Sequence, residues 1–254
     1  MEDTHMSNHN LIMEGWQKFI NESRAPVTEI DGKQICLYYH SKRPPGFSIV
    51  LYIVDPQQNR LKGFKVIGGI DCVTTEDPCI PKTLQVGTSY RHSDYAGKGL
   101  GPLLYDLAFF IAQSMGYGLT SDRETGSKPK ARNRWSKIEA DPNYEKQKTK
   151  AGNDKFDYYN DTPGDPDDDC SKDLFGDSNA TDHSFIKKDS DSIHDTLMQL
   201  EANHMNHLDS IPKARAKNDF LMDLRLESTD LFHDEYDLAE TKMTPYKLHE
   251  NFRK

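Results

Sequence analysis

The hydrophobic residues between positions 33 and 90 follow the short period that is typical of β-strands. Val, Ile, Tyr and Phe gather in short runs, and Pro, Gly, Asp and Asn separate these runs. The composition of residues 55–59 favours a hairpin connection between two of the runs. The pattern predicts four strands, at residues 34–40, 48–54, 63–73 and 84–90.

Beyond residue 100 the spacing changes to that of an amphipathic helix. The predicted helix ends at Gly116, and one apolar face of it contains Leu103, Leu104, Leu107, Ala108 and Ile111. A short strand is predicted at residues 117–123, and a second helix at 128–140. Strand, helix, strand and helix therefore follow one another after the first group of strands.

The two ends of the chain have other patterns. Residues 7–22 form a short amphipathic peptide, which we expect to dock on its own domain or on a partner, because isolated helices of this length are marginal in water. Residues 144–182 are polar and have no period, so they predict a loop or linker. Helical spacing returns at residues 192–208 and 214–226.

The composition indicates a domain with appendages rather than one compact body. Only 35% of the 254 residues are hydrophobic, and this low share implies that part of the chain buries little surface. The predicted parts are an N-terminal amphipathic peptide at 1–25, a domain at 30–142, an acidic loop or linker at 143–190 and a helical C-terminal extension at 191–254.

Charge is distributed unevenly along the chain, whose formal net charge is −9. Residues 157–182 hold nine acids and one base, whereas residues 123–138 hold six bases and one acid. The overall acidity argues against a general nucleic-acid-binding protein, whose surface should be basic. No run approaches the ~18 apolar residues of a membrane span, and no leader peptide is recognisable, so we expect a soluble intracellular protein.

Metal ligands are not predicted. The cysteines at 36, 72, 79 and 170 form no Cys-x-x-Cys pair, and we interpret them as reduced structural thiols. Residues 165–169 are acidic, but they lack the spacing of a calcium loop, so a solvated turn is favoured. Glu201, His204 and His207 share one helical face, which we interpret as polar surface rather than as a metal site.

The most distinctive motif is a glycine-rich turn between a predicted strand and the first long helix. Gly97, Gly99 and Gly101 alternate with other residues, and Pro102 takes a first-turn position that tolerates proline. Such glycines allow positive φ, and the free N–H groups of a helix N-terminus attract anions. Pro102 excludes a dinucleotide fingerprint, and the absence of Gly-Lys-Ser/Thr excludes a Walker loop. The turn therefore predicts another kind of phosphate site.

The sequence Ala96-Gly97-Lys98-Gly99-Leu100-Gly101 resembles the Arg/Gln-x-x-Gly-x-Gly pyrophosphate loop of the GCN5-related N-acetyltransferase superfamily, with Ala96 in place of Arg or Gln. The resemblance implies an α+β fold with a mixed sheet and flanking helices, and acetyl-CoA as the cofactor. It also implies that the strands at 84–91 and 117–123 splay apart around the pantetheine arm. The implied cofactor-binding residues are Tyr90, Arg91, Ala96, Gly97, Lys98, Gly99, Leu100 and Gly101.

The same resemblance implies direct attack of an amine on the thioester, which needs a base for the amine proton and an acid for the leaving thiolate. Asp122 and Glu124 are the candidate bases, because they lie on or directly after the second of the splayed strands. An ion pair between Asp122 and Arg123 that closes the strand is the competing structural interpretation.

The acid of the superfamily is usually a tyrosine in an Ala-x-x-x-Tyr pattern. Here the pattern corresponds to Ala131 and Trp135, and an indole cannot supply a phenolic proton. Tyr144, Tyr117 or water is then the candidate acid, and Tyr144 is the residue we select.

Two further resemblances concern bacteriophages. The spacing of Ser121, Ser127 and Trp135 is similar to that in acetyltransferase-fold proteins of tailed bacteriophages, over residues 60–175. The end of the N-terminal peptide, Ile20-Asn21-Glu22, is similar to the cleavage motif of phage capsid-targeting peptides, with an ordinary terminal docking helix as the alternative.

Together these resemblances imply an acetyl-CoA-dependent N-acetyltransferase that modifies a protein or a small amine in the host cytoplasm. The alternative is a virion-associated or interaction protein with the same fold and a non-catalytic site. It would contact virion or capsid proteins through its N-terminal peptide and C-terminal helices. Neither function needs a membrane, and acylation of a nucleobase is disfavoured by the net charge.

Overall fold

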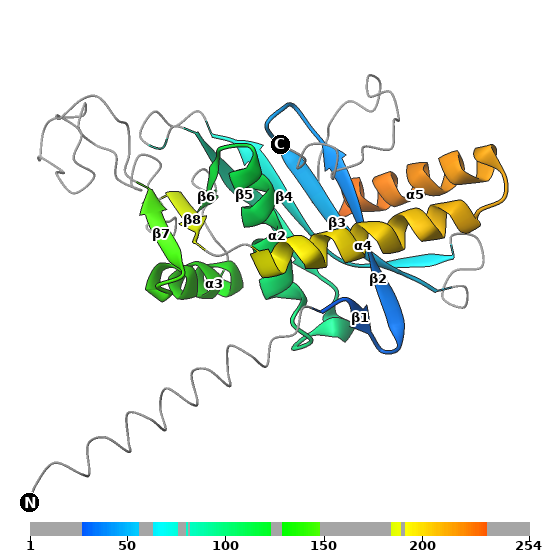
Figure 1. The fold of residues 1–254 in the computed structure, drawn as a ribbon, viewed down its shortest axis with the longest axis horizontal. Coiled ribbons are helices and arrows are strands. Elements are labelled where there is room, and N and C mark those ends of the chain that lie inside the picture. The colour runs from blue at the N-terminus through cyan, green and yellow to red at the C-terminus, as the bar shows by residue number, and fades with distance from the viewer. Residues whose placement is uncertain are drawn as a thin grey trace, which may run out of the picture.

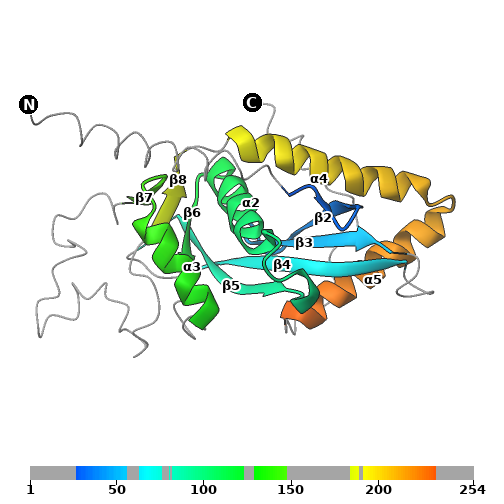
Figure 2. The same ribbon diagram turned by 90° about the horizontal axis from the view of Figure 1, so that it is seen from below.

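The computed structural model describes residues 27–55, 63–75, 80, 82–122, 129–147, 184–188 and 191–232. In these residues the chain has an α+β fold, in which an eight-stranded mixed sheet carries helices on both faces (Figures 1 and 2). None of the described helices is long and apolar enough to cross a membrane. The N-terminal peptide, Arg123, Glu124 and Ser127 lie outside the described residues.

The strands are β1 (Glu29–Ile30), β2 (Lys33–Ser41), β3 (Phe47–Val54), β4 (Phe64–Thr74), β5 (Thr83–Arg91), β6 (Gly118–Ser121), β7 (Tyr144–Gln147) and β8 (Ser184–Lys187). The helices are the 3-10 turn η1 (Ser93–Tyr95), α2 (Leu100–Ser114), α3 (Pro129–Ala140), α4 (Asp191–Ser210) and α5 (Ala214–Phe232). The strand order is β1-β2-β3-β4-β5-β6-β8-β7, and among these described strands only the pair β5–β6 is parallel.

The structure confirms the strands predicted before residue 91 as β2 to β5, and the predicted helices as α2 to α5. The strand predicted at 117–123 is the shorter β6. The loop or linker predicted at 143–190 is wrong for two segments: residues 144–147 form β7 at the edge of the sheet, and residues 184–187 form β8 beside it. The sequence Tyr-Glu-Lys-Gln has no apolar period, and this strand is defined by its pairing with β8.

The centre of the sheet explains the long apolar runs of the sequence. Every residue of β3 except Val54 is buried, because both faces of this strand are covered. On one face, Ile49 and Leu51 belong to the larger core, beneath α2 and the first half of α4. On the other face, Val50 and Tyr52 belong to a smaller core beneath α5. Figure 2 shows α2 and α4 on one side of the strands and α5 on the other.

Helix α4 closes the exposed edge of β2, which pairs with only two residues of β1 on that side. The amide of Asn203 donates a hydrogen bond to the Ile35 carbonyl at 2.8 Å, so this edge carbonyl is satisfied. Nδ1 of His204 lies 2.7 Å from the Tyr52 hydroxyl. Glu201 and His204 are only 6% and 7% exposed, so the face of α4 that we interpreted as polar surface is mostly buried against the sheet.

Candidate functional site

The candidate site is built on the turn that joins β5 to α2. β5 ends at Arg91 and is followed by the turn η1. The ring of Tyr95, in this turn, is buried and anchors the chain in the core. Ala96 is extended, with φ −61° and ψ 136°, and Gly99 is the N-cap of α2, with φ 82° and ψ −2°. Figure 1 shows that α2 runs from this turn back along the strands.

The backbone of the turn requires two of the three glycines of the loop, and the third is not required by the fold. Gly97 and Gly99 have φ values of 78° and 82°, which L side chains rarely adopt, so the turn requires glycine at both positions. Gly101 has no positive φ, and a Cβ there would meet no atom outside its own helix within 4 Å. Alanine at this position would favour the helix by about 1 kcal/mol. Nothing in the described fold therefore requires glycine at position 101. A ligand that lies close to the backbone there would require it, because a side chain would occupy the space of the ligand.

The first turn of α2 offers backbone N–H groups to an anion. Leu100 and Gly101 precede the first intrahelical bond, which the Leu103 N–H donates to the Gly99 carbonyl at 3.2 Å. Pro102 has no N–H, and no side chain among the described residues caps this end of the helix. The first turn contains no acidic residue, so the positive end of the helix dipole attracts an anion. The turn can hold a phosphate or pyrophosphate group.

The other cofactor-binding candidates differ in what they offer. Arg91 is exposed, and within the described residues its guanidinium makes no ion pair or hydrogen bond. Tyr90 is half-buried, and burial raises the pKa of its phenol. Leu100 can contribute only its backbone, because its side chain is fully buried. Arg91 is thus the side chain of this group that is free to meet a negative charge.

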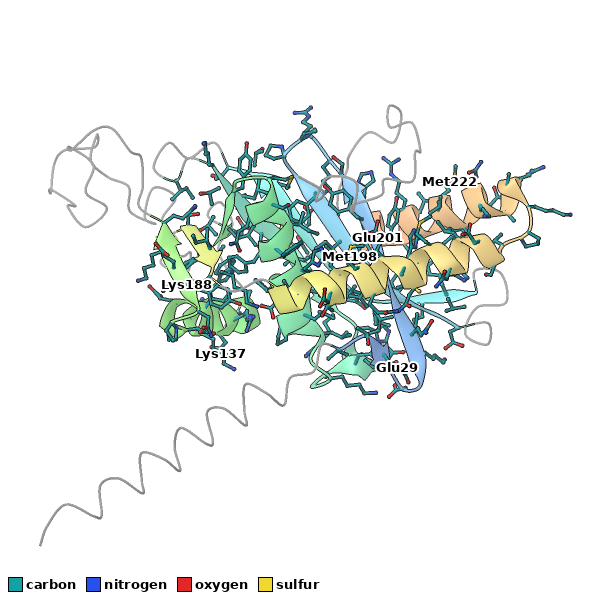
Figure 3. All side chains as sticks on the ribbon, in the orientation of Figure 1. Glu29, Lys137, Lys188, Met198, Glu201 and Met222 are labelled. Carbon is teal, nitrogen blue, oxygen red and sulfur yellow. The ribbon has the colours of Figure 1, made fainter. Side chains whose placement is uncertain are left out.

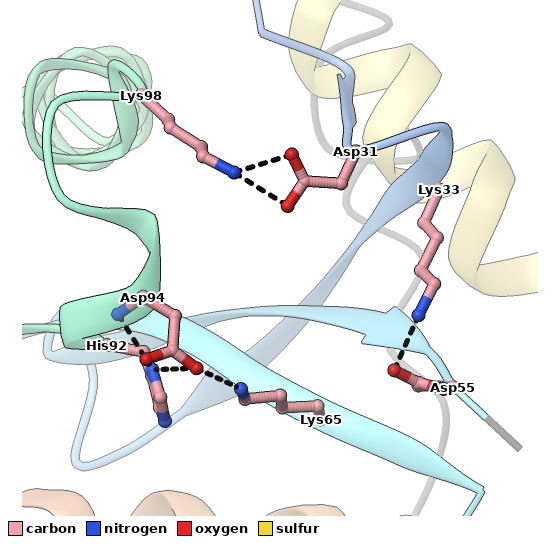
Figure 4. A network of polar contacts seen from close by, with 7 residues as sticks. All are labelled: Asp31, Lys33, Asp55, Lys65, His92, Asp94 and Lys98. Atoms are coloured by element: carbon pink, nitrogen blue, oxygen red, sulfur yellow. Dashed lines mark hydrogen bonds and ion pairs between the residues drawn. The ribbon is translucent and has the colours of Figure 1, made fainter. Parts of the chain in front are cut away.

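Lys98, the cation of the loop, is paired with a carboxylate. Its Nζ lies 2.6 Å from Oδ2 of Asp31, in the turn between β1 and β2 (Figure 4). A second ion pair joins Lys65 of β4 to Asp94 at 2.8 Å, and this hydrogen bond lowers the pKa of the Asp94 carboxyl. These two pairs hold the loop against β4 and the β1–β2 turn. Lys98 therefore points to Asp31 rather than to the N-terminus of α2.

β5 and β6 run in parallel over a short distance and then separate. Their last pair joins Val86 to Ser121, where β6 ends, while β5 continues along β4 to Arg91. Directly after this pair β5 has a bulge, in which Gly87 is the extra residue against β4. A bulge bends its strand, so it turns β5 at the point where β6 stops. We call the region between residues 88–91 of β5 and the end of β6 the wedge.

The predicted base lies at the wedge. Asp122 follows Ser121 directly and is half-buried. Its predicted ion-pair partner Arg123 and the second candidate base, Glu124, lie outside the described residues.

The predicted acids lie elsewhere. Tyr117 precedes β6 and is therefore at the opposite end of that strand from the wedge. Tyr144 is on β7, which β8 separates from β6, and its hydroxyl donates to Oδ1 of Asp106 at 2.9 Å. Burial raises the pKa of Tyr144 well above its ordinary value. Trp135 on α3 is 2% exposed, and its ring packs in the larger core against Phe109 and Phe185.

The phenol that reaches the wedge is that of Tyr105, which the sequence analysis did not select. It belongs to α2, and its Oη lies 3.4 Å from Oγ of Ser89, in the part of β5 that β6 does not pair. Burial raises the pKa of Tyr105, while Ser89 and the Arg134 guanidinium lower it. In the sequence Tyr105 is one apolar position of an amphipathic helix, and only the register of β5 reveals its neighbour.

In the described part of the chain, no three His, Cys, Asp or Glu residues are grouped so that they could hold a metal ion. His204 instead contacts the Tyr52 hydroxyl, and the His207 ring packs against Phe220. Comparison of the chain with protein families, curated proteins and solved structures gives no match.

Proposed function

We propose that this protein is an acetyl-CoA-dependent N-acetyltransferase with the fold of the superfamily that its glycine loop resembles. One observation carries the proposal: the only parallel pair among the described strands separates after a bulge, and the separating strand leads directly into a glycine loop and a helix N-terminus. The amides of Leu100 and Gly101 would hold the pyrophosphate, and the wedge would hold the pantetheine arm.

The residues around the loop fit such a cofactor. Gly97 and Gly101 leave the backbone accessible, since a Cβ at either position would meet no atom within 4 Å. Arg91 adds an exposed cation at the end of β5. Val27 limits the space on the side of Gly99, where a Cβ would lie 3.0 Å from its Cγ2. The site therefore offers donors and space at one end of α2 and a hydrophobic boundary beside it.

When bound, acetyl-CoA supplies an activated thioester. Asp122, at the end of β6, is placed to take the proton of an amine that enters the wedge. Tyr105 is placed to hold a proton for the leaving sulfur, because its hydroxyl reaches Ser89, in the part of β5 that β6 does not pair. It replaces Tyr144 in this role, since the Tyr144 hydroxyl already donates a hydrogen bond to Asp106, and β8 separates β7 from β6.

A second candidate function is a virion-associated or interaction protein that keeps the fold without acetyl transfer. Two observations favour it: Trp135 fills the core where the superfamily has its acid, and Lys98 is paired with Asp31. The N-terminal peptide and its cleavage motif, which motivate this function, lie outside the described residues. Host cytoplasm and virion are the corresponding proposed locations.

Calorimetric titration of the full chain with acetyl-CoA tests the proposal. We expect one site per chain and cleavage of the thioester when amines are added. Binding without cleavage across an amine panel would favour the second function. Absence of binding at millimolar acetyl-CoA would contradict both the enzyme and the cofactor site.

A further inference from the structure

Arg134 is a basic residue of α3 that turns inward. Arg132 and Lys137 are exposed on the same helix, and Lys137 extends away from the fold (Figure 3). The Arg134 side chain is only 19% exposed, and its Cζ lies 5.6 Å from the centroid of the Tyr105 ring. The guanidinium therefore lies between α3 and α2, on the same tyrosine whose hydroxyl reaches the wedge.

The guanidinium has donors that the described protein does not use. Its Nε is buried and has no hydrogen-bond partner among the residues that the structure describes. Its Nη2 lies 3.6 Å from Oδ1 of Asp106, a distance that allows charge attraction but not a hydrogen bond. An arginine presents five N–H donors, and a buried one that is left unsatisfied costs free energy. The arrangement is explained if a ligand supplies the missing acceptor.

The charges around Arg134 are also unbalanced. Oδ1 of Asp106 accepts from the Tyr144 hydroxyl at 2.9 Å and lies 3.2 Å from Nζ of Lys187. One carboxylate oxygen thus faces a hydroxyl and two cations, whose side chains are 17% and 19% exposed. Among the described side chains in contact with Asp106, two positive charges thus face one negative charge, and the Asp141 carboxylate acts on the Tyr144 hydroxyl only through space, so one positive charge is in excess at these contacts. A monoanion would neutralise it, whereas a dianionic phosphate would leave an excess of negative charge.

We propose that Arg134 and Lys187 bind a carboxylate group, and that the acyl acceptor is an amine that also carries a carboxylate, as an amino acid does. The identity of the acceptor rests on the proposed function. The binding of a carboxylate rests only on the contacts of Arg134, Lys187 and Asp106. A guanidinium can bind both oxygens of a carboxylate through two parallel hydrogen bonds, which a point charge such as lysine cannot do.

The test follows the Nε–H signal of Arg134 by NMR while acetate is added to the full chain at constant ionic strength. This signal is assigned by its loss in Arg134→Gln. The indole N–H of the neighbouring Trp135 serves as a second reporter that remains in the variants. We expect a saturable response of both signals in the natural chain, and at least about tenfold weaker binding by the Trp135 signal in Arg134→Gln.

Arg132→Gln is the matched control, because it removes the same charge from an exposed position of the same helix. It should bind acetate as the natural chain does. The carboxylate site would be overturned if Arg132→Gln lost as much affinity for acetate as Arg134→Gln, or if the Arg134 signal did not respond to acetate. Tighter binding of inorganic phosphate than of acetate would overturn it as well.

A kinetic comparison tests the acceptor. With acetyl-CoA as donor, Arg134→Gln should lower kcat/KM for glycine at least about tenfold more than for glycinamide, which lacks the carboxylate. An equal loss for both would overturn the acceptor class. Because the NMR titration contains no acetyl-CoA, its result does not depend on whether the proposed transferase function is correct.

Discussion

Gly97 and Gly101 lie in the same loop, but only Gly97 is required by its own backbone. Its φ of 78° demands glycine, whereas Gly101 lies in a helix with open space around it. The alternation of glycines was visible in the sequence, and so was their position before a helix. The ion pair of Lys98 with Asp31 was not, because the two residues are distant in sequence and meet only when β1 pairs with β2.

Asp31→Asn should tighten the binding of acetyl-CoA. Lys98 must leave Asp31 before it can contact a phosphate, and an exposed pair of this kind contributes up to about 1 kcal/mol, so the expected gain is up to about fivefold. Calorimetry at low and high salt measures it. In the Lys98→Gln background the substitution should have no effect, and an equal gain there would show that Lys98 does not meet the ligand.

Among the secondary-structure elements, the strands and helices with a clear hydrophobic period could be predicted from that period, whereas the separation of β5 and β6 was implied only by the resemblance. The wedge depends on where β6 stops pairing and on the bulge at Gly87, and both are properties of strand register. β7 and β8 have four residues each, too few for a period to be recognised. Tyr105 was missed because its role depends on its contact with Ser89, which is set by the register of β5 and not by the pattern of the helix.

The contact of α4 with β3 predicts that acid destabilises the protein. Burial lowers the pKa of His204 from 6.5 to about 4. Between these two pH values this histidine is therefore neutral in the folded chain and protonated in the unfolded chain. The stability is therefore complete above about pH 6.5 and is lost as the pH falls toward 4. From pH 7 to pH 5 we expect a loss of about 2 kcal/mol from this residue.

Urea unfolding at the two pH values, compared between the natural chain and His204→Gln, measures this contribution. The variant keeps a polar group near Tyr52 but cannot titrate in this range, so its pH dependence should be smaller. His40, whose pKa is also lowered to about 4 by burial and by Arg225 and Lys42, accounts for part of the dependence that remains. Identical pH dependence in both chains would contradict the role of His204.

For the molecule as a whole, the sequence predicted an α+β fold with a C-terminal helical extension. The structure adds that α4 and α5 complete both cores: Leu197 and Leu200 belong to the larger one, and Leu208 and Leu224 to the smaller one. The amphipathic spacing of these helices predicted that they would pack, but a local pattern does not identify the surface that receives them. The helices close one edge of the sheet and leave the glycine loop accessible at one end of α2.

Gly101→Asp tests the central proposal most directly, when its stability and its affinity for acetyl-CoA are measured together. A carboxylate in the first turn of α2 interacts favourably with the helix dipole, so stability should be unchanged or raised by up to about 1 kcal/mol. The same carboxylate would repel a pyrophosphate, and the affinity should fall at least about tenfold. Met222→Asp, which adds the same charge at a position of α5 that is 52% exposed on the opposite face of the sheet, should bind like the natural chain. If Gly101→Asp binds acetyl-CoA as tightly as the natural chain, the glycine loop is not the pyrophosphate site.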